Sequence, residues 1–309
     1  MVSNICFTAG QELRARGSGY RKYVWLHSAA PIAASALLVL LTVLSGHIAP
    51  EGGLSNMQTH TMITTALTLL QIAVSVAALF WDAGLQYITL AFRRGEVLQA
   101  SDLAKGFFRL RPILGSWIYR WSNYLLMMMV AGTASSLLMS LVPVSNRMYQ
   151  ELLAFTNNPV FPLQGSVLTL ACIYFVIYLV VLAAVLLPVV YRHRLTAFFI
   201  MDNEPVRGLQ AVMQSSIVMR GNRLELLKLD LRFWWYYLGQ AGVLVLSMGE
   251  LIFTDAPAGS WLFPLLALVF QLALYLIAKP RLALSYGLFY EQLLNTHKEA
   301  AAQRMAAEE

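Results

Sequence analysis

Six long apolar stretches alternate with polar connections along the chain. They cover roughly residues 26–48, 62–92, 117–142, 167–191, 233–253 and 261–284. A bilayer core about 30 Å thick requires about 20 apolar residues in a helix that crosses it, and each stretch meets this requirement. The pattern therefore predicts an all-α fold, a polytopic membrane bundle of six transmembrane helices that forms a single domain over residues 1–309.

Composition supports the membrane class. Hydrophobic residues make up 58% of the chain and charged residues only 12%, whereas about 25% of an ordinary soluble domain is charged. A signal peptide is the competing interpretation of the first stretch, because Arg21 and Lys22 precede it. We interpret it as a retained helix, since no clear small-residue cleavage pattern follows and five more stretches come after it.

The polar connections predict the orientation. Every Lys and Arg except Arg147 lies in the N-terminal flank, in the second or fourth connection, near the start of the third stretch, or on the C-terminal side. Translocated loops disfavour cationic side chains, so we expect both termini in the cytoplasm, and we expect a bacterial cytoplasmic membrane. The formal net charge of +6 then reflects topology. No nucleic-acid-reading motif is present, and we expect no nucleic-acid partner.

Two cytoplasmic segments have the spacing of short amphipathic helices, at about 101–111 and 204–221. Ser101 and Asn203 are their expected N-caps, Pro112 is expected to end the first, and Gly221 the second. Such helices lie at the bilayer surface or cover a bundle end; the alternative is a regulatory or partner-binding role. Residues 295–309 form a polar tail.

Basic residues on and beside these two helices are candidates for contact with anionic lipid headgroups on the cytoplasmic side, because the cytoplasmic leaflet is negatively charged. They are Arg109, Arg111, Arg207, Arg220 and Arg223. The alternative is that these cations act only in setting topology during insertion.

Intramembrane charge suggests a binding site. Asp82 lies 11 residues before Arg93, which at 1.5 Å per residue is about 16 Å. It falls near mid-bilayer if the helix end marks the membrane border, and near the interface if the bilayer covers the first half of this long stretch. A mid-bilayer carboxylate requires a partner or a proton. Lys279 and Arg281 either extend to the interface or pair with Asp82 or an anionic headgroup.

Helix packing and cysteine content carry further expectations. Alanines at 29, 30, 33, 34 and 36 permit close approach of another helix, from this chain or from another membrane protein. Cys6 and Cys172 fall in different environments, so no disulfide framework is expected.

Catalytic motifs are missing from the sequence. The five histidines, His27, His47, His60, His193 and His297, have no metal-site spacing, and no phosphate-binding glycine loop or G-x-S-x-G elbow occurs. We expect no metal, no cofactor and no enzymatic activity.

Three segments resemble one family of bacterial integral membrane proteins, known as domain of unknown function 975. The residues are Asp202-Asn203-Glu204-Pro205 with Ala211, Ser215, Met219, Gly221, Arg223, Leu229-Asp230-Leu231 and Phe233; Pro280, Ser285, Phe289-Tyr290 and Leu293; and Arg94-Gly95-Glu96 with Asp102-Leu103 and Gly106-Phe107. Two departures stand out. The family's Leu-Ser-Phe-Ile-Gly-Trp run reads Leu231-Arg232-Phe233-Trp234-Trp235-Tyr236 here, and Arg281 follows Pro280 where the family has Tyr. The resemblance implies a polytopic fold in a bacterial membrane and brings no activity.

Three functions are consistent with these features. The first, which we favour, is a non-enzymatic membrane factor that binds lipid or another membrane protein. The second is a small transporter or the substrate-binding membrane subunit of one, although no inverted repeat is visible. The third is a membrane enzyme acting on lipid, which would need an acid–base or metal site.

Overall fold

The computed structural model describes residues 2–47, 53–141, 150, 165–202, 206–247 and 262–308. Within these ranges the chain is helical and has no strand, which confirms the all-α fold class. The helices are α1 (Val2–Ala15), α2 (Gly17–His47), α3 (Gly53–Arg93), the 3₁₀ helix η1 (Ala100–Arg109), α4 (Leu110–Met139), α6 (Gly165–Arg192), α7 (Thr196–Asp202), α8 (Gly208–Val218), α9 (Arg223–Arg232), α10 (Trp234–Ser247) and α12 (Leu262–Glu308).

Four helical stretches in the described residues are long and apolar enough to cross a membrane: Thr61–Arg93, Ala100–Met139, Ala171–Asp202 and Phe263–Gln303. They include the second, third, fourth and sixth predicted spans. Helix α2 contains the described part of the first span, and α10 contains residues 234–247 of the fifth. These two spans, and the total of six, stay predictions.

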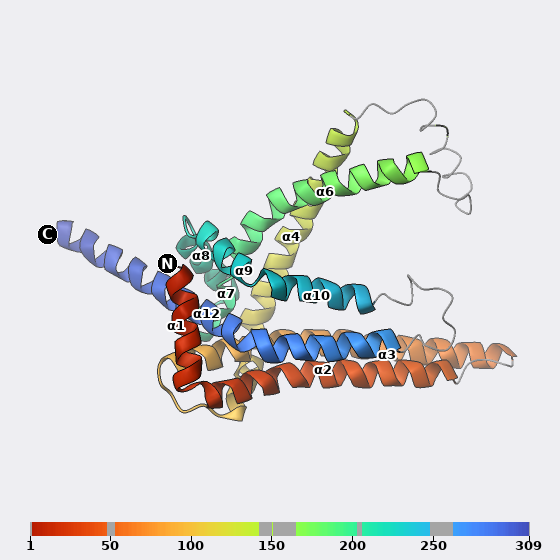
Figure 1. The fold of residues 1–309 in the computed structure, drawn as a ribbon, viewed down its shortest axis with the longest axis horizontal. Helices are drawn as coiled ribbons and strands as arrows, with labels where there is room; N and C mark the ends of the chain where they lie inside the picture. The colour runs from red at the N-terminus through yellow and green to blue at the C-terminus, as the bar shows by residue number, and fades with distance from the viewer. Residues whose placement is uncertain are drawn as a thin grey trace. The chain divides into compact units, whose positions relative to one another are not determined.

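The chain forms two compact units, residues 1–115 with 195–309, and residues 116–194. In the first unit α2, α3 and α12 run side by side (Figure 1), η1 packs on α3, and α10 packs on α12. Helix α1 contacts α2, α9 and α12. The second unit holds α6 and most of α4, where Trp117, Trp121 and Tyr124 form consecutive ring contacts and Tyr119 meets the ring of His193 edge-on at 6.1 Å.

The burial of large apolar side chains changes along each of the helices α2, α3 and α12. One part of each helix exposes large apolar side chains, and the other part buries them. The exposed set includes Leu37, Leu40, Leu69, Ile72, Val269 and Phe270; the buried set includes Tyr20, Val24, Ile88, Leu90, Leu284 and Phe289. Exposed apolar surface is suited to lipid, whereas buried apolar side chains form a protein core. The change occurs near His27, Phe80 and Ala278.

The structure differs from the prediction at Pro112. Helix α4 begins at Leu110 and includes Pro112 in its first turn, where proline is tolerated because the N–H groups there have no partner within the helix. The predicted surface helix is the 3₁₀ helix η1. Gln99, not Ser101, is its N-cap, and the backbone N–H of Gln99 donates to Asp102 at 2.8 Å.

Other helix ends also differ from expectation. Helix α8 begins at Gly208, and the expected cap Asn203 lies outside the described residues. Gly221 has a positive φ of 86°, as a residue that ends a helix often does, and the separate helix α9 follows it. The expected polar tail continues α12 up to Glu308.

Two glycines allow η1 to lie directly on α3. A Cβ built on Gly106 would be 1.9 Å from the carbonyl oxygen of Phe80, and one built on Gly84 would be 1.9 Å from that of Leu103. The two backbones therefore touch, which only residues without a side chain permit. This contact also places Phe107 against Phe80 and Trp81.

Prolines inside two helices explain two tryptophan contacts. A proline lacks the N–H that would bond to the carbonyl four residues earlier, so Pro31 in α2 frees the carbonyl of His27 and Pro280 in α12 frees that of Leu276. The indole of Trp81 donates to the His27 carbonyl at 2.9 Å, and the indole of Trp25 donates to the Leu276 carbonyl at 3.2 Å. Each bond joins two neighbouring helices at the level where burial changes.

Candidate anionic-ligand site

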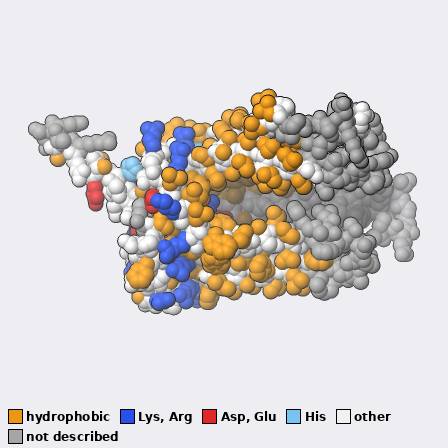
Figure 2. All heavy atoms as spheres, turned by 45° about the horizontal axis from the view of Figure 1, so that its top comes forward, with side chains coloured by type: hydrophobic (Ala, Val, Ile, Leu, Met, Phe, Trp, Pro, Cys, Tyr) orange, Lys and Arg blue, Asp and Glu red, His pale blue; other side chains and the backbone are white. Residues whose placement is uncertain are grey.

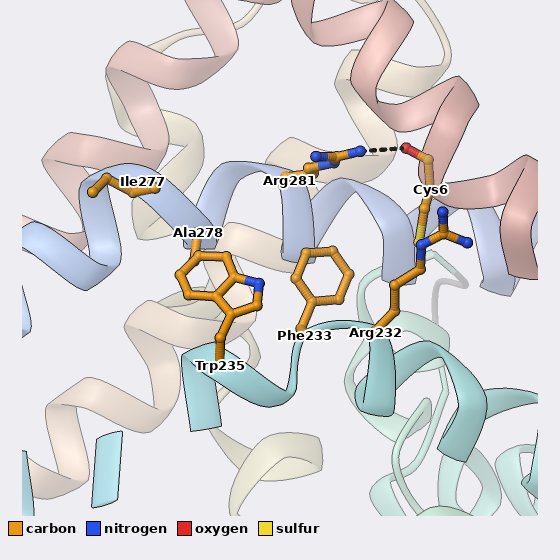
Figure 3. A pocket seen from close by; sticks show the side chains of 7 residues that line it. All are labelled: Cys6, Arg232, Phe233, Trp235, Ile277, Ala278 and Arg281. Carbon is orange, nitrogen blue, oxygen red and sulfur yellow. Dashed lines mark hydrogen bonds between the residues drawn. The ribbon is translucent and has the colours of Figure 1, made fainter. Parts of the chain in front are cut away.

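A cavity of about 340 Å³ lies between α1, α12 and the junction of α9 with α10 (Figure 3). We call it the α10 cavity. Its lining residues are Cys6, Arg232, Phe233, Trp235, Ile277, Ala278 and Arg281. The Nη2 of Arg281 donates to the carbonyl oxygen of Cys6 at 3.3 Å, and Figure 3 shows Arg232 reaching toward Cys6 from the opposite element. The cavity thus combines two guanidinium groups with apolar and aromatic walls.

A second cavity of about 330 Å³ lies between α1, α2 and α12. We call it the α2 cavity. It is lined by Gly10, Leu13, Arg14, Arg21, Trp25, Leu276, Ile277, Pro280 and Arg281. Ile277 and Arg281 therefore line both cavities.

The two cavities are cationic. Four arginines line them, and in the described part of the chain no Asp or Glu is among the lining residues. The acid of α1, Glu12, is paired with Arg93, whose Nε also bonds Glu291 at 2.9 Å. The site is therefore complementary to an anion.

Three segments around the cavities, in α2, in α12 and at the junction of α9 with α10, order an arginine and an apolar residue in the same direction. In α2, Arg21 precedes Trp25 by one turn. At the junction of α9 with α10, Arg232 at the end of α9 precedes Trp235 of α10. In α12, which runs the opposite way, Ile277 precedes Arg281. One turn is about 5.4 Å. In α2 and α12 the arginine lies toward the buried part of the helix and the apolar residue toward the part with exposed apolar side chains. At the junction, Arg232 ends α9, where Leu226 and Leu229 are buried, and Trp235 lies in α10, which has no buried residue. This order matches an amphiphile with an anionic head.

Cys6 contributes shape and no charge. Burial raises the pKa of the Cys6 thiol above its ordinary value, although the charges of Arg232 and Arg281 act in the opposite direction. The thiol is therefore neutral at pH 7, and only a thiolate is a strong nucleophile. Within the described residues, no three His, Cys, Asp or Glu side chains form a metal-binding group.

The structure brings Asp82 and Lys279 near each other and places Arg281 elsewhere. Asp82 Oδ1 lies 3.1 Å from Nε2 of the fully buried His27, while its own side chain is 62% exposed. The His27 ring stacks on Trp81 at 6.1 Å. The Lys279 ammonium attracts Asp82 and lies 4.3 Å from the centre of the Tyr275 ring. This polar cluster sits where burial changes along α2, α3 and α12.

The arginines of the predicted lipid-contact set differ in their surroundings. Arg109 donates to the carbonyl of Ile200, so part of its guanidinium is occupied within the chain. Arg223 is half-buried, whereas Arg111, Arg207 and Arg220 are exposed.

Residues of the family signature take part in two polar groups. Arg94 pairs with Asp202, which also accepts a bond from the hydroxyl of Tyr290 at 2.8 Å. Hydrogen bonding to Asp202 raises the pKa of Arg94, so the guanidinium stays charged. Asp230 accepts bonds from Tyr237 at 2.8 Å and from Tyr286. These groups tie α7, α9 and α10 to α3 and α12, and we interpret them as structural.

Sequence reasoning missed most of the cavity arginines. Arg14, Arg21 and Arg232 entered the sequence argument as topology signals or as a departure from the family pattern. A signal was present: Arg232, Trp235 and Arg281 are positions where this chain departs from that pattern, and all three line the α10 cavity. Large residues there replace smaller ones, or Tyr in the case of Arg281.

On the face shown in Figure 2, Lys and Arg side chains gather in a band at one margin of the apolar surface. Together with four stretches of spanning length among the described residues, this defines a helical protein with the features of a membrane protein. The model of the family described as "Protein of unknown function (DUF975)" matches residues 31–297, so the chain belongs to this family. No curated protein and no solved structure matches it.

Proposed function

We propose that the protein is a non-enzymatic membrane factor that binds an anionic phospholipid in the α10 and α2 cavities. The observation that carries this proposal is the common order of arginine and apolar residue in α2, in α12 and at the junction of α9 with α10. A phosphate at the arginine level would place the acyl chains beside Trp25, Trp235 and Ile277.

Binding energies favour a phosphate held in the cavities over a general attraction of surface cations to the leaflet. Guanidinium groups bind phosphate oxygens through paired charge-assisted bonds. Each cation near a negative leaflet contributes about 1 kcal/mol, and the attraction decays within a Debye length. Arginines that converge on two cavities lose less freedom on binding than isolated surface arginines do.

The proposed topology puts these cavities on the cytoplasmic side, with six spans and both termini inside. Reporter fusions after Asn146 and after Asp255 are expected to read as external. Fusions after Gln99, Asn222 and Glu309 are expected to read as cytoplasmic, because cations are retained on that side. A cytoplasmic signal at Asn146 would contradict the topology.

Lipid binding is tested by thermal unfolding in nanodiscs of neutral lipid and of neutral lipid mixed with phosphatidylglycerol. We expect the anionic lipid to stabilise the protein at low salt, and added salt to weaken the effect. The triple variant Arg14→Gln, Arg21→Gln and Arg232→Gln is expected to lose most of this stabilisation.

The matched control removes the same charge from exposed positions that line neither cavity and are not among the predicted lipid-contact arginines, in the triple variant Lys22→Gln, Lys228→Gln and Lys298→Gln. It is expected to keep most of the stabilisation. Equal losses in the two variants would mean that net surface charge, and not the cavities, binds the lipid. Equal melting temperatures of the unmodified protein in both lipids would overturn the proposed function.

A further inference from the structure

Arg281 and Ile277 form a wall common to the α10 and α2 cavities. Building on the proposed function, we propose that the preferred ligand is a phospholipid with two phosphate groups joined by a short linker. One phosphate occupies each cavity, and Arg281 lies between them.

The distribution of charge supports two phosphates. Besides the shared Arg281, the α10 cavity has Arg232, and the α2 cavity has Arg14 and Arg21. A single phosphodiester in either cavity leaves the arginines of the other without an anion. A lipid with two phosphates neutralises both groups at once. Because the second contact is then intramolecular, the linked ligand binds more tightly than two separate ones.

The position of Arg281 suits a bridging role. Its Nη2 donates to the Cys6 carbonyl at 3.3 Å, and a Cβ built on Gly10 would lie 3.5 Å from the same nitrogen. The side chain thus rests against the glycine of α1, which fixes its direction. A guanidinium has five N–H donors in one plane, so donors other than the one bound to Cys6 can face each cavity.

The apolar groups fit the same ligand. Trp25 lies on the lipid-suited side of the α2 cavity and Trp235 on that of the α10 cavity, with Ile277 between them. Their exposed fractions are 43%, 40% and 72%, so they present open surface to acyl chains. The acyl chains attached to the two phosphate groups would lie on either side of Ile277.

The test compares two anionic lipids at equal charge. Nanodiscs of phosphatidylcholine receive diphosphatidylglycerol, or twice the molar amount of phosphatidylglycerol, and lipid bound to the purified full-length protein is counted by native mass spectrometry alongside thermal unfolding. We expect diphosphatidylglycerol to bind at least about tenfold more tightly per molecule. Equal stabilisation at matched charge would overturn the two-phosphate inference and leave the proposed function standing. No stabilisation by either lipid would overturn both.

Single-residue variants distinguish a lipid that spans both cavities from one that is only attracted by positive charge. Arg232→Gln alone and Arg21→Gln alone each remove charge from one cavity, and each is expected to lower diphosphatidylglycerol affinity to about that of phosphatidylglycerol. Arg281→Gln is expected to remove the preference, and Arg281→Lys to restore only part of it, because a single ammonium replaces a fork of donors. Lys298→Gln is the control and is expected to keep the preference, because Lys298 is exposed, lines neither cavity and is not among the predicted lipid-contact arginines. A preference that persists in Arg232→Gln and Arg21→Gln would overturn the inference.

Discussion

Replacing Gly106 by alanine is expected to destabilise the first unit by about 3 kcal/mol, the upper end of the usual cost of overpacking. The added Cβ would lie 1.9 Å from the carbonyl oxygen of Phe80 and 3.1 Å from the backbone nitrogen of Gly84. These are backbone atoms of α3, so no side-chain rotation relieves the clash. The 3₁₀ helix η1 must move away, and Phe107 would lose its contacts with Phe80 and Trp81. Thermal unfolding of the purified protein measures the effect.

Other glycines of the same unit provide the controls. Gly84→Ala is expected to cost about as much as Gly106→Ala, because its Cβ would meet the carbonyl of Leu103 at 1.9 Å. Gly19 and Gly115 lie in helices, and nothing lies within 4 Å of a Cβ built on them. Alanine at these two positions is expected to stabilise the protein by about 0.5–1 kcal/mol, since glycine is the more flexible residue in the unfolded chain. A neutral Gly106→Ala variant would contradict the close contact between η1 and α3.

Such close contacts mark the limit of sequence-based prediction for this fold. The apolar stretch at 167–191 predicts α6 (Gly165–Arg192) to within two residues, because hydrophobic length is a local property of the sequence. The pairing of Gly84 with Gly106 depends on how η1 folds back over α3, which no local pattern encodes. Helix α1 was missed although Val2, Ile5, Ala9 and Leu13 have helical spacing and are buried, since its short apolar face lies outside the six long stretches.

In the candidate site, too, local features could be predicted from the sequence, whereas features that depend on packing could not. A search for intramembrane charge finds Asp82, Lys279 and Arg281, because each is a charged residue within an apolar stretch. The sequence does not reveal that Arg281 joins Arg232 and Arg14 from other helices, or that Lys279 faces Asp82 and His27 instead. Those groupings depend on helix rotation and packing. The six-span topology and the lipid contacts of the exposed arginines stay predictions.

Pro31 leaves the carbonyl of His27 without a donor in α2, and the indole of Trp81 donates to that carbonyl instead. This arrangement predicts how the two residues depend on each other in a double mutant. Trp81→Phe removes the indole N–H that bonds the carbonyl of His27, and Pro31 prevents the helix from supplying another donor. A buried carbonyl left without a donor costs about 1–3 kcal/mol, so we expect a loss of this size, to which the loss of ring contacts with His27 and Phe107 adds.

The variant Pro31→Ala separates these contributions. Alanine at position 31 restores the N–H that bonds the His27 carbonyl within α2, so the carbonyl no longer depends on Trp81. We expect Trp81→Phe to cost about 1 kcal/mol less in the Pro31→Ala background than in the unmodified protein, a coupling within the range of contacting residues. Thermal unfolding of the four proteins measures it. Trp234→Phe is the control, because Trp234 is 58% exposed and its cost is expected to be the same in both backgrounds. If Trp81→Phe costs the same in both backgrounds as well, the indole contributes only through its ring contacts, and Pro31 does not create the need for a donor on α3.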